Sequence, residues 1–244
     1  KLPPLLPCSL PVTEPNQTCG VQGNESVRVA LCFWGFAGRS MPYTLDALRT
    51  NVVGPLKQFP GGALDIFVHA LTAPRVQNSH RSKEGWRVSC SLSFLMLEPC
   101  SYGVSQQHAV DLEFALTSRV VKSMQASEGV RHPYNDEQTL LNIYRSRYSL
   151  SQVGKLVRAQ ELHGGFEYVY VVAVRPDTTF LAPIPLHSFS GAADIWVGSA
   201  QSGHARRINF AGGGARVFGG GINDRVAFGR RGPLRRPYRT QFDV

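Results

Sequence analysis

A charged pair of residues follows the most apolar run of the chain. Residues 168–174 read YVYVVAV, and Arg175, Pro176 and Asp177 come directly after them. A carboxylate at a strand end suits a divalent cation that keeps positions open for water and phosphate oxygens, and a guanidinium can pair with phosphate. The alternative is a structural ion pair between Arg175 and Asp177 that caps the strand. The tripeptide alone leaves both interpretations open.

A second candidate segment follows the first apolar run, at residues 35–40. It contains Gly35, Gly38, Arg39 and Ser40. Glycines lack a Cβ and let a nucleotide approach the backbone closely, while the arginine and serine could meet phosphate at a helix start. The segment matches neither a Walker loop nor a dinucleotide fingerprint, and a plain strand-to-helix turn is the simpler interpretation.

Two other places carry polar groups that could take part in chemistry. Asn223, Asp224 and Arg225 follow a run of glycines, and Asp224 could accept a proton from an incoming hydroxyl. The alternative is a glycine-rich loop whose Asn and Asp satisfy turn amides. His69 ends another apolar run and faces either the same crevice or the protein interior as a structural histidine.

The elements that must position these residues alternate between strands and helices. Continuous Val-rich and Tyr-rich runs predict strands covered on both faces. Because Pro176 cannot donate to a ladder, the third long strand ends near Arg175, and Asp177 lies beyond its carboxyl end, where ligands bind in open α/β sheets. The order predicts a three-layer α/β/α sandwich with a mixed central sheet. The predicted strands are 27–34, 64–70, 168–174 and 194–197, and the predicted helices are 43–56, with Thr44 as a possible cap, and one or two within 137–162.

The composition favours one domain with anionic partners. The chain has 244 residues, 43% of them apolar, and 26 Lys and Arg against 17 Asp and Glu give a formal charge of +9. We expect a Pro-rich arm over residues 1–26, a catalytic domain over 27–229, and a solvated basic tail over 230–244. A nucleic-acid binder would rest on the arginines of that tail alone, since no interleaved aromatic residues form a recognisable module.

The cysteines and glycosylation acceptors favour a secretory compartment. Cys8 with Cys19, and Cys90 with Cys100, are candidate disulfides, whereas Cys32 lies in an apolar run and is expected to be a buried free thiol. Asn-x-Ser/Thr triplets begin at residues 16 and 24. No apolar run is long enough for a transmembrane helix. Because the sequence begins at Lys1 without Met, we expect an excerpt whose signal or membrane anchor lies upstream.

Several of these segments together resemble a known family. The residues are VALCFWGFAGRS at 29–40, LDIFVHAL at 64–71, YRSRYSL at 144–150, YVYVVAVRPDTTFLAPI at 168–184 and GGGINDRVAFG at 219–229. They are similar to glycosyltransferase-like proteins of algae, plants, bacteria and large viruses that have a GT-A-type nucleotide-sugar-binding fold. The likeness covers about residues 27–229.

The resemblance implies transfer of a sugar from a nucleotide-sugar donor to a glycan or glycoprotein acceptor, in the Golgi lumen. Arg-Pro-Asp stands in place of the family's Asp-any-Asp motif, which makes Asp177 the ligand of Mn²⁺ or Mg²⁺, with Arg175 assisting at the departing diphosphate. The resemblance places Asp224 as general base of an inverting transfer. It places Arg39 and the turn around it, with Gly35, Gly38 and Ser40, at the donor, and Asn223 and Arg225 are candidates beside Asp224 at the acceptor. His69, at the end of its apolar run, is a further candidate for donor binding.

Two features of this chain depart from the family pattern. Members often have an arginine two residues before the arginine of Arg-Pro-Asp, and here that position is Ala173. The family usually continues into helices after Asn-Asp-Arg, whereas this sequence soon ends in GRRGPLRRPYRTQFDV. These departures favour an alternative, a non-catalytic nucleotide- or glycan-binding protein that retains the fold.

Overall fold

The computed structural model describes the central part of the chain in several stretches. These are residues 27–72, 75–78, 82–87, 92–113, 137–184, 195–198, 205–208 and 226–231. The predicted arm at 1–26, the candidate residues Asn223, Asp224 and Arg225, and all but the first two residues of the predicted tail lie outside them. Predictions about those residues stay predictions.

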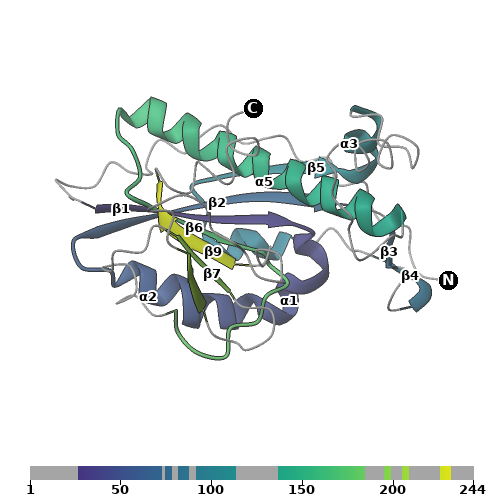
Figure 1. Ribbon diagram of the computed structural model, residues 1–244, viewed down its shortest axis with the longest axis horizontal. Coiled ribbons are helices and arrows are strands. Elements are labelled where there is room, and N and C mark those ends of the chain that lie inside the picture. Colours follow the sequence, from purple (N-terminus) through teal and green to yellow (C-terminus); the bar gives the residue numbers. More distant parts are fainter. Residues whose placement is uncertain are drawn as a thin grey trace.

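A seven-stranded mixed sheet forms the centre of the molecule (Figure 1). Its strands run in the order β5-β2-β1-β6-β9-β7-β8. The pairs among β5, β2, β1 and β6 are parallel, and those among β6, β9, β7 and β8 are antiparallel. The bounds are β1 (Val27–Gly35), β2 (Gly62–Thr72), β5 (Ser101–Gln106), β6 (Tyr170–Val174), β7 (Ile195–Gly198), β8 (Ala205–Ile208) and β9 (Val226–Arg230). The predicted mixed α/β sheet is confirmed.

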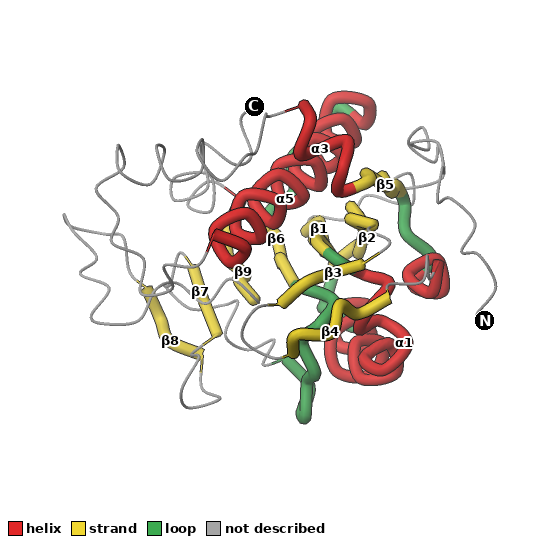
Figure 2. Tube along the Cα trace, turned by 90° about the vertical axis from the view of Figure 1, so that its right-hand side faces the viewer, coloured by secondary structure: helices red, strands yellow, loops and turns green. Residues whose placement is uncertain are grey.

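Helices cover both faces of this sheet (Figures 1 and 2). The long helix α5 (Glu137–Gly164) lies on one face, and α1 (Ala37–Leu48) continues through a π-helical turn, η1 (Arg49–Val53), into α2 (Gly54–Lys57) on the other. A short helix, α3 (Gln107–Glu113), follows β5, and a 3-10 segment, η2 (Leu92–Leu97), precedes it. A separate antiparallel pair joins β3 (Arg75–Asn78) to β4 (Ser82–Arg87).

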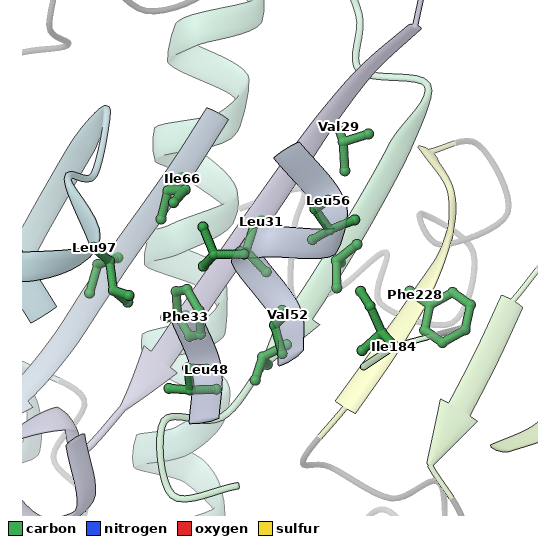
Figure 3. Packing of buried hydrophobic residues seen from close by; sticks show 14 of the residues in the cluster. Val29, Leu31, Phe33, Leu48, Val52, Leu56, Ile66, Leu97, Ile184 and Phe228 are labelled. Atoms are coloured by element: carbon green, nitrogen blue, oxygen red, sulfur yellow. The ribbon is translucent and has the colours of Figure 1, made fainter. Parts of the chain in front are cut away.

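The sheet has one apolar core on each side because its central strands bury both faces. Alternate residues of β1 divide between the cores: Leu31 and Phe33 pack toward α1 and η1, whereas Cys32 and Trp34 pack toward α5. Figure 3 shows the first core, in which side chains from η1, α2 and β2 meet those of β1, with Phe228 of β9 at one end. Burial of this apolar surface, which contributes about 25 cal/mol per Å², holds the three layers together.

Several sequence-based boundaries change in the structure. The helix predicted at 43–56 begins at Ala37, so Gly38, Arg39 and Ser40 belong to its first turn and not to a loop. Thr44 is therefore not its cap. The region 137–162 is one helix, and the apolar run 92–97 is a 3-10 segment. β6 ends at Val174, as the position of Pro176 predicted.

Two further predictions concern cysteine and the basic tail. Cys32 is a buried free thiol, as expected, and burial raises the pKa of that thiol to about 12. Cys8, Cys19 and Cys90 lie outside the described residues, so both disulfides stay predictions. The predicted tail starts at Arg230, but Arg230 closes β9 and Arg231 forms an ion pair with Glu161 of α5. Among the described helices, none has an apolar stretch long enough to cross a bilayer.

Candidate functional site

The direction in which the chain adds strands to the sheet reverses between β1 and β6. From β1 the chain passes through α1 on one face and returns as β2, whereas α5 on the opposite face leads into β6 on the other side of β1. The parallel register pairs Phe33 with Val174 and Gly35 with Ala70. In open α/β sheets this is the switch point, and the crevice outside the carboxyl ends of the strands is where ligands bind.

Gly35 forms the turn from β1 into α1. Its φ is +104°, a conformation that strains any residue with a Cβ, and its N–H donates to Ser149 Oγ at 2.8 Å. The next residue, Phe36, is the N-cap of α1 and has no side-chain oxygen to accept from the first-turn amides. Those amides and the positive end of the helix dipole favour an anion at this position. The first turn holds Gly38, Arg39 and Ser40, whose side chains lie outside the description.

Arg175 and Asp177 form a bidentate pair beyond the end of β6. Arg175 Nε donates to Asp177 Oδ1 at 3.1 Å and Nη2 donates to Oδ2 at 2.7 Å. The side chains are 29% and 37% exposed, so water screens the pair and the ligand-free state gains little from it. This contact agrees with the structural ion pair foreseen as an alternative to metal binding. Within the described residues, no three His, Cys, Asp or Glu side chains gather as a metal site.

The backbone around this pair is fixed by helix α1 and the π-helical turn. Thr44 Oγ1 donates to the Pro176 carbonyl at 2.6 Å, and the Thr178 N–H donates to the Arg175 carbonyl at 3.1 Å. Seven residues along from Thr44, Asn51 Nδ2 donates to the Phe180 carbonyl at 2.7 Å, and the Asn51 carbonyl accepts from the Ile184 N–H at 2.8 Å. The segment that carries Asp177 is thus held against the helix at several points.

His69 lies at the same edge of the sheet but inside the protein. It is 4% exposed, and its Nδ1 and Nε2 lie 2.8 Å from Ser149 Oγ and 3.1 Å from Ser105 Oγ. Burial lowers the pKa of His69 to about 3, so the imidazole is neutral at physiological pH. The expectation that His69 touches the donor directly is not what this geometry shows. The structure favours the alternative, a satisfied interior histidine.

Helix α5 supplies groups that sequence reasoning did not single out. Ser149 bonds to His69, the Tyr148 ring packs edge-on against the imidazole at 5.8 Å, and Arg145 forms a bidentate pair with Asp111 of α3. Arg145, Tyr148 and Ser149 are spaced i, i+3 and i+4, which places them on one helical face. All three belong to the YRSRYSL segment, so that helical spacing is the signal that could have indicated them.

The start of β9 approaches the same edge. β9 pairs antiparallel with β6, and the register partner of Val226 is Val174. The chain therefore enters β9 where it leaves β6 toward Arg175 and Asp177. The hairpin of β3 and β4 also lies beyond the carboxyl ends of β1 and β2 (Figures 1 and 2). Four segments distant in sequence converge at this edge: the α1 start, the Arg-Pro-Asp end, the β9 start and the hairpin.

No protein-family model matches the chain, and searches of curated proteins and of solved structures found no match either. The geometry of the edge and the chemistry of its residues are therefore what indicates a function.

Proposed function

We propose that the chain is a metal-dependent glycosyltransferase with a GT-A-type fold that binds a nucleotide-sugar donor at the carboxyl-terminal edge of its sheet. The observation that carries this proposal is the pairing of β6 with both β1 and β9. It brings the start of α1, the Arg175–Asp177 segment and the start of β9 to one edge. A phosphate-binding helix start, a carboxylate and an adjoining loop are the groups that such a transfer requires.

In this proposal the diphosphate of the donor lies at the start of α1. Gly35 and Gly38 leave room for it, and Arg39, Ser40 and Arg175 supply donors and positive charge. Since Arg175 is partly exposed and sits in a weak surface pair, it can exchange Asp177 for phosphate oxygens at little cost.

Asp177 is the residue that would hold Mn²⁺ or Mg²⁺. Its side chain is the more exposed member of the pair, and Thr44 of α1 fixes the backbone of the preceding Pro176, which fits a metal held mainly by diphosphate oxygens. When bound, the metal would neutralise charge that develops on the departing diphosphate. Asp224 is the proposed base toward the acceptor hydroxyl, with Asn223 and Arg225 at the acceptor, in a secretory compartment such as the Golgi lumen.

A second candidate function is binding of a nucleotide or glycan without turnover. Both carboxylate oxygens of Asp177 already accept from Arg175, and among the described residues no group of three His, Cys, Asp or Glu side chains gathers to hold a metal. A site of this kind binds a diphosphate through Arg175 and the helix start while leaving the metal weakly held.

The test measures nucleotide binding and sugar release with and without Mn²⁺. Wild-type protein is screened by thermal shift against UDP, GDP, ADP and CDP, and the nucleotide that stabilises it most is then offered as its nucleotide sugars. Asp177→Asn removes the charge proposed to bind the metal. Glu167→Gln is the matched control, because it removes an exposed carboxylate near the amino-terminal end of β6.

For a glycosyltransferase, sugar release depends on Mn²⁺ or Mg²⁺ and falls at least 100-fold in Asp177→Asn, while Glu167→Gln stays at the wild-type rate. Stabilisation by nucleotide without sugar release over long incubation supports the binding protein instead. Full activity in Asp177→Asn contradicts the assignment of Asp177 to the metal.

A further inference from the structure

A chain of hydrogen bonds crosses the carboxyl-terminal edge of the sheet at three adjacent strands. We call it the edge network, and it consists of Gly35, His69, Ser105, Tyr148 and Ser149. Its contacts run from the Gly35 N–H to Ser149 Oγ, from Ser149 to His69, and from His69 to Ser105. The edge network joins the turn of the proposed donor site to the end of β5, two strands away.

The hydrogen bonds of Ser149 determine the tautomer of His69. Ser149 has one hydroxyl proton and two lone pairs, and its oxygen lies 3.0 Å from the His69 carbonyl, 2.8 Å from His69 Nδ1 and 2.8 Å from the Gly35 nitrogen. All three bonds form only if the hydroxyl donates to the carbonyl and accepts from the Gly35 N–H and from Nδ1–H. Nε2 of the neutral ring is then unprotonated and can only accept.

The tautomer determines what Ser105 offers to a ligand. Its hydroxyl proton is directed to Nε2 at 3.1 Å, so the bond to Tyr148 runs from the phenol to the Ser105 oxygen, which keeps one lone pair as an acceptor. Ser105 is half-buried at the end of β5, and the Tyr148 hydroxyl lies 3.5 Å from its oxygen. The partner that fits an oriented neutral acceptor is an uncharged donor such as a ring hydroxyl, since an anion has no proton to donate to it.

We propose that Ser105 and Tyr148 form a subsite that accepts a ring hydroxyl of the sugar portion of the ligand, with His69 and Ser149 as positioning residues. The proposal rests on the proposed function and names its substrate contact, a hydroxyl of either the ribose or the transferred sugar. Arg175 and the α1 start hold the phosphates, and the edge network meets the uncharged, hydroxyl-bearing part of the same molecule.

A nucleophilic role for Ser105 is a poorer fit to the same contacts. A serine nucleophile needs a base that can keep its proton, and such bases are usually supported by a carboxylate at the other ring nitrogen. Here Nδ1 faces a serine hydroxyl, and burial lowers the pKa of His69 to about 3. The imidazole therefore orients the Ser105 proton and does not remove it.

The ring of His69 is held firmly enough for this positioning role. A Cβ on Gly103 of β5 would lie 3.1 Å from His69 Cδ2, so the glycine at this position leaves space for the imidazole. Tyr148 also contacts the ring, edge-on at an interplanar angle of 79°. Replacing Tyr148 by Phe keeps this packing and removes only the hydroxyl.

The experiment measures ligand affinity by calorimetry for wild type, Ser105→Ala, Tyr148→Phe and the control Ser101→Ala, which makes the same change at the other end of β5. The ligands are UDP, GDP, ADP and CDP, their 2′-deoxy and 3′-deoxy counterparts, and the glucose and galactose conjugates of whichever nucleotide binds best. Thermal unfolding without ligand confirms that each variant is folded.

If the hydroxyl belongs to ribose, Ser105→Ala weakens nucleotide binding about tenfold, and one deoxy counterpart binds wild type and Ser105→Ala with equal, reduced affinity. If it belongs to the transferred sugar, Ser105→Ala weakens only the conjugates. Tyr148→Phe shows the same ligand dependence with a smaller loss, and Ser101→Ala matches wild type.

Wild-type affinity of Ser105→Ala for every nucleotide and conjugate overturns the subsite and leaves the proposed function standing. Labelling of Ser105 by a fluorophosphonate also overturns it, because that reaction needs an activated nucleophile. If no nucleotide binds wild type, the proposed function fails. Titration with free glucose, galactose and ribose then decides the subsite: Ser105-dependent binding supports it, and no binding overturns it.

Discussion

Both ends of strand β6 have a bidentate arginine–carboxylate pair near them, and the two pairs differ in burial. Near the amino-terminal end of β6, Arg231 binds Glu161 through two contacts of 2.8 Å, and their side chains are 15% and 8% exposed. Beyond its end, Arg175 binds Asp177 with side chains 29% and 37% exposed. The same chemistry therefore serves structure at one end and stays accessible at the other.

The surroundings of the two ends reinforce this difference. At the amino-terminal end, Glu161 also accepts from the Tyr168 N–H, and the Tyr168 hydroxyl donates to Asp65 at 2.6 Å inside the protein. Burial raises the pKa of Tyr168, so this donor keeps its proton. These polar groups satisfy one another away from water. At the carboxyl-terminal end, by contrast, Arg175, Asp177 and Ser105 stay partly exposed to water.

The largest effect is expected at the amino-terminal pair. Arg231→Met leaves Glu161 buried without its counter-charge and should lower the free energy of unfolding by about 3 kcal/mol. Urea denaturation measures it. The neighbouring exposed Arg230→Met is the matched control and should change stability by less than about 0.5 kcal/mol. Equal effects of the two substitutions would mean that the buried pair with Glu161 contributes no more to stability than an exposed arginine does.

The next largest effect is expected from acid, which should lower the free energy of unfolding through His69. Its folded-state pKa of about 3 lies below the ordinary value of 6.5, so folding favours the neutral ring. This contribution is complete above pH 6.5 and is lost as pH falls from 6.5 toward 3, about 2 kcal/mol of it by pH 5. Denaturation at pH 7 and pH 5 measures the loss, and His69→Gln should reduce it. His163→Gln, at an exposed histidine in the last turn of α5, should not.

A smaller loss is expected for the serine that connects α5 to two strands. Ser149→Ala leaves the buried Gly35 N–H and the His69 ring without this partner and should cost roughly 1 to 2 kcal/mol of unfolding free energy. Ser101→Ala provides the contrast, because the Ser101 oxygen is buried without a hydrogen-bond partner in the described part of the chain. Its removal should leave stability unchanged or raise it by up to about 1 kcal/mol. Similar losses in both variants would show that the edge network contributes nothing.

The smallest change in stability is expected at the accessible pair. Arg175→Ala should alter the unfolding free energy by no more than about 0.5 kcal/mol, since an exposed pair gains little over water. The proposed function predicts that the same substitution weakens nucleotide binding about tenfold in calorimetry. A loss of stability as large as that of Arg231→Met, with unchanged binding, would make the two ends of β6 equivalent.

Much of the fold follows from local patterns in the sequence. The long apolar runs form β1, β2 and β6 because strands buried on both faces need no alternation of polar residues. Pro176 ended β6 as expected, since it cannot donate to a ladder. The start of α1 was missed because Gly35–Ser40 contains two glycines, which favour a turn locally, whereas packing of the following helix against the sheet carries the helix back to Ala37.

The sequence by itself determined the long buried strands β1, β2 and β6, the end of β6, and the place of Arg175 and Asp177 beyond it, whereas it did not indicate β3, β4, β5, β8 or β9. Only the tertiary structure decided which strand lies beside which, and hence that the ends of β1 and β6 and the start of β9 lie at one edge. It also decided that His69 is interior and that Ser105 and Ser149 contact it. The contacting residues are 36 and 80 positions from His69. The physical reason is that local patterns encode burial and chain direction, whereas long-range contacts depend on how whole layers pack.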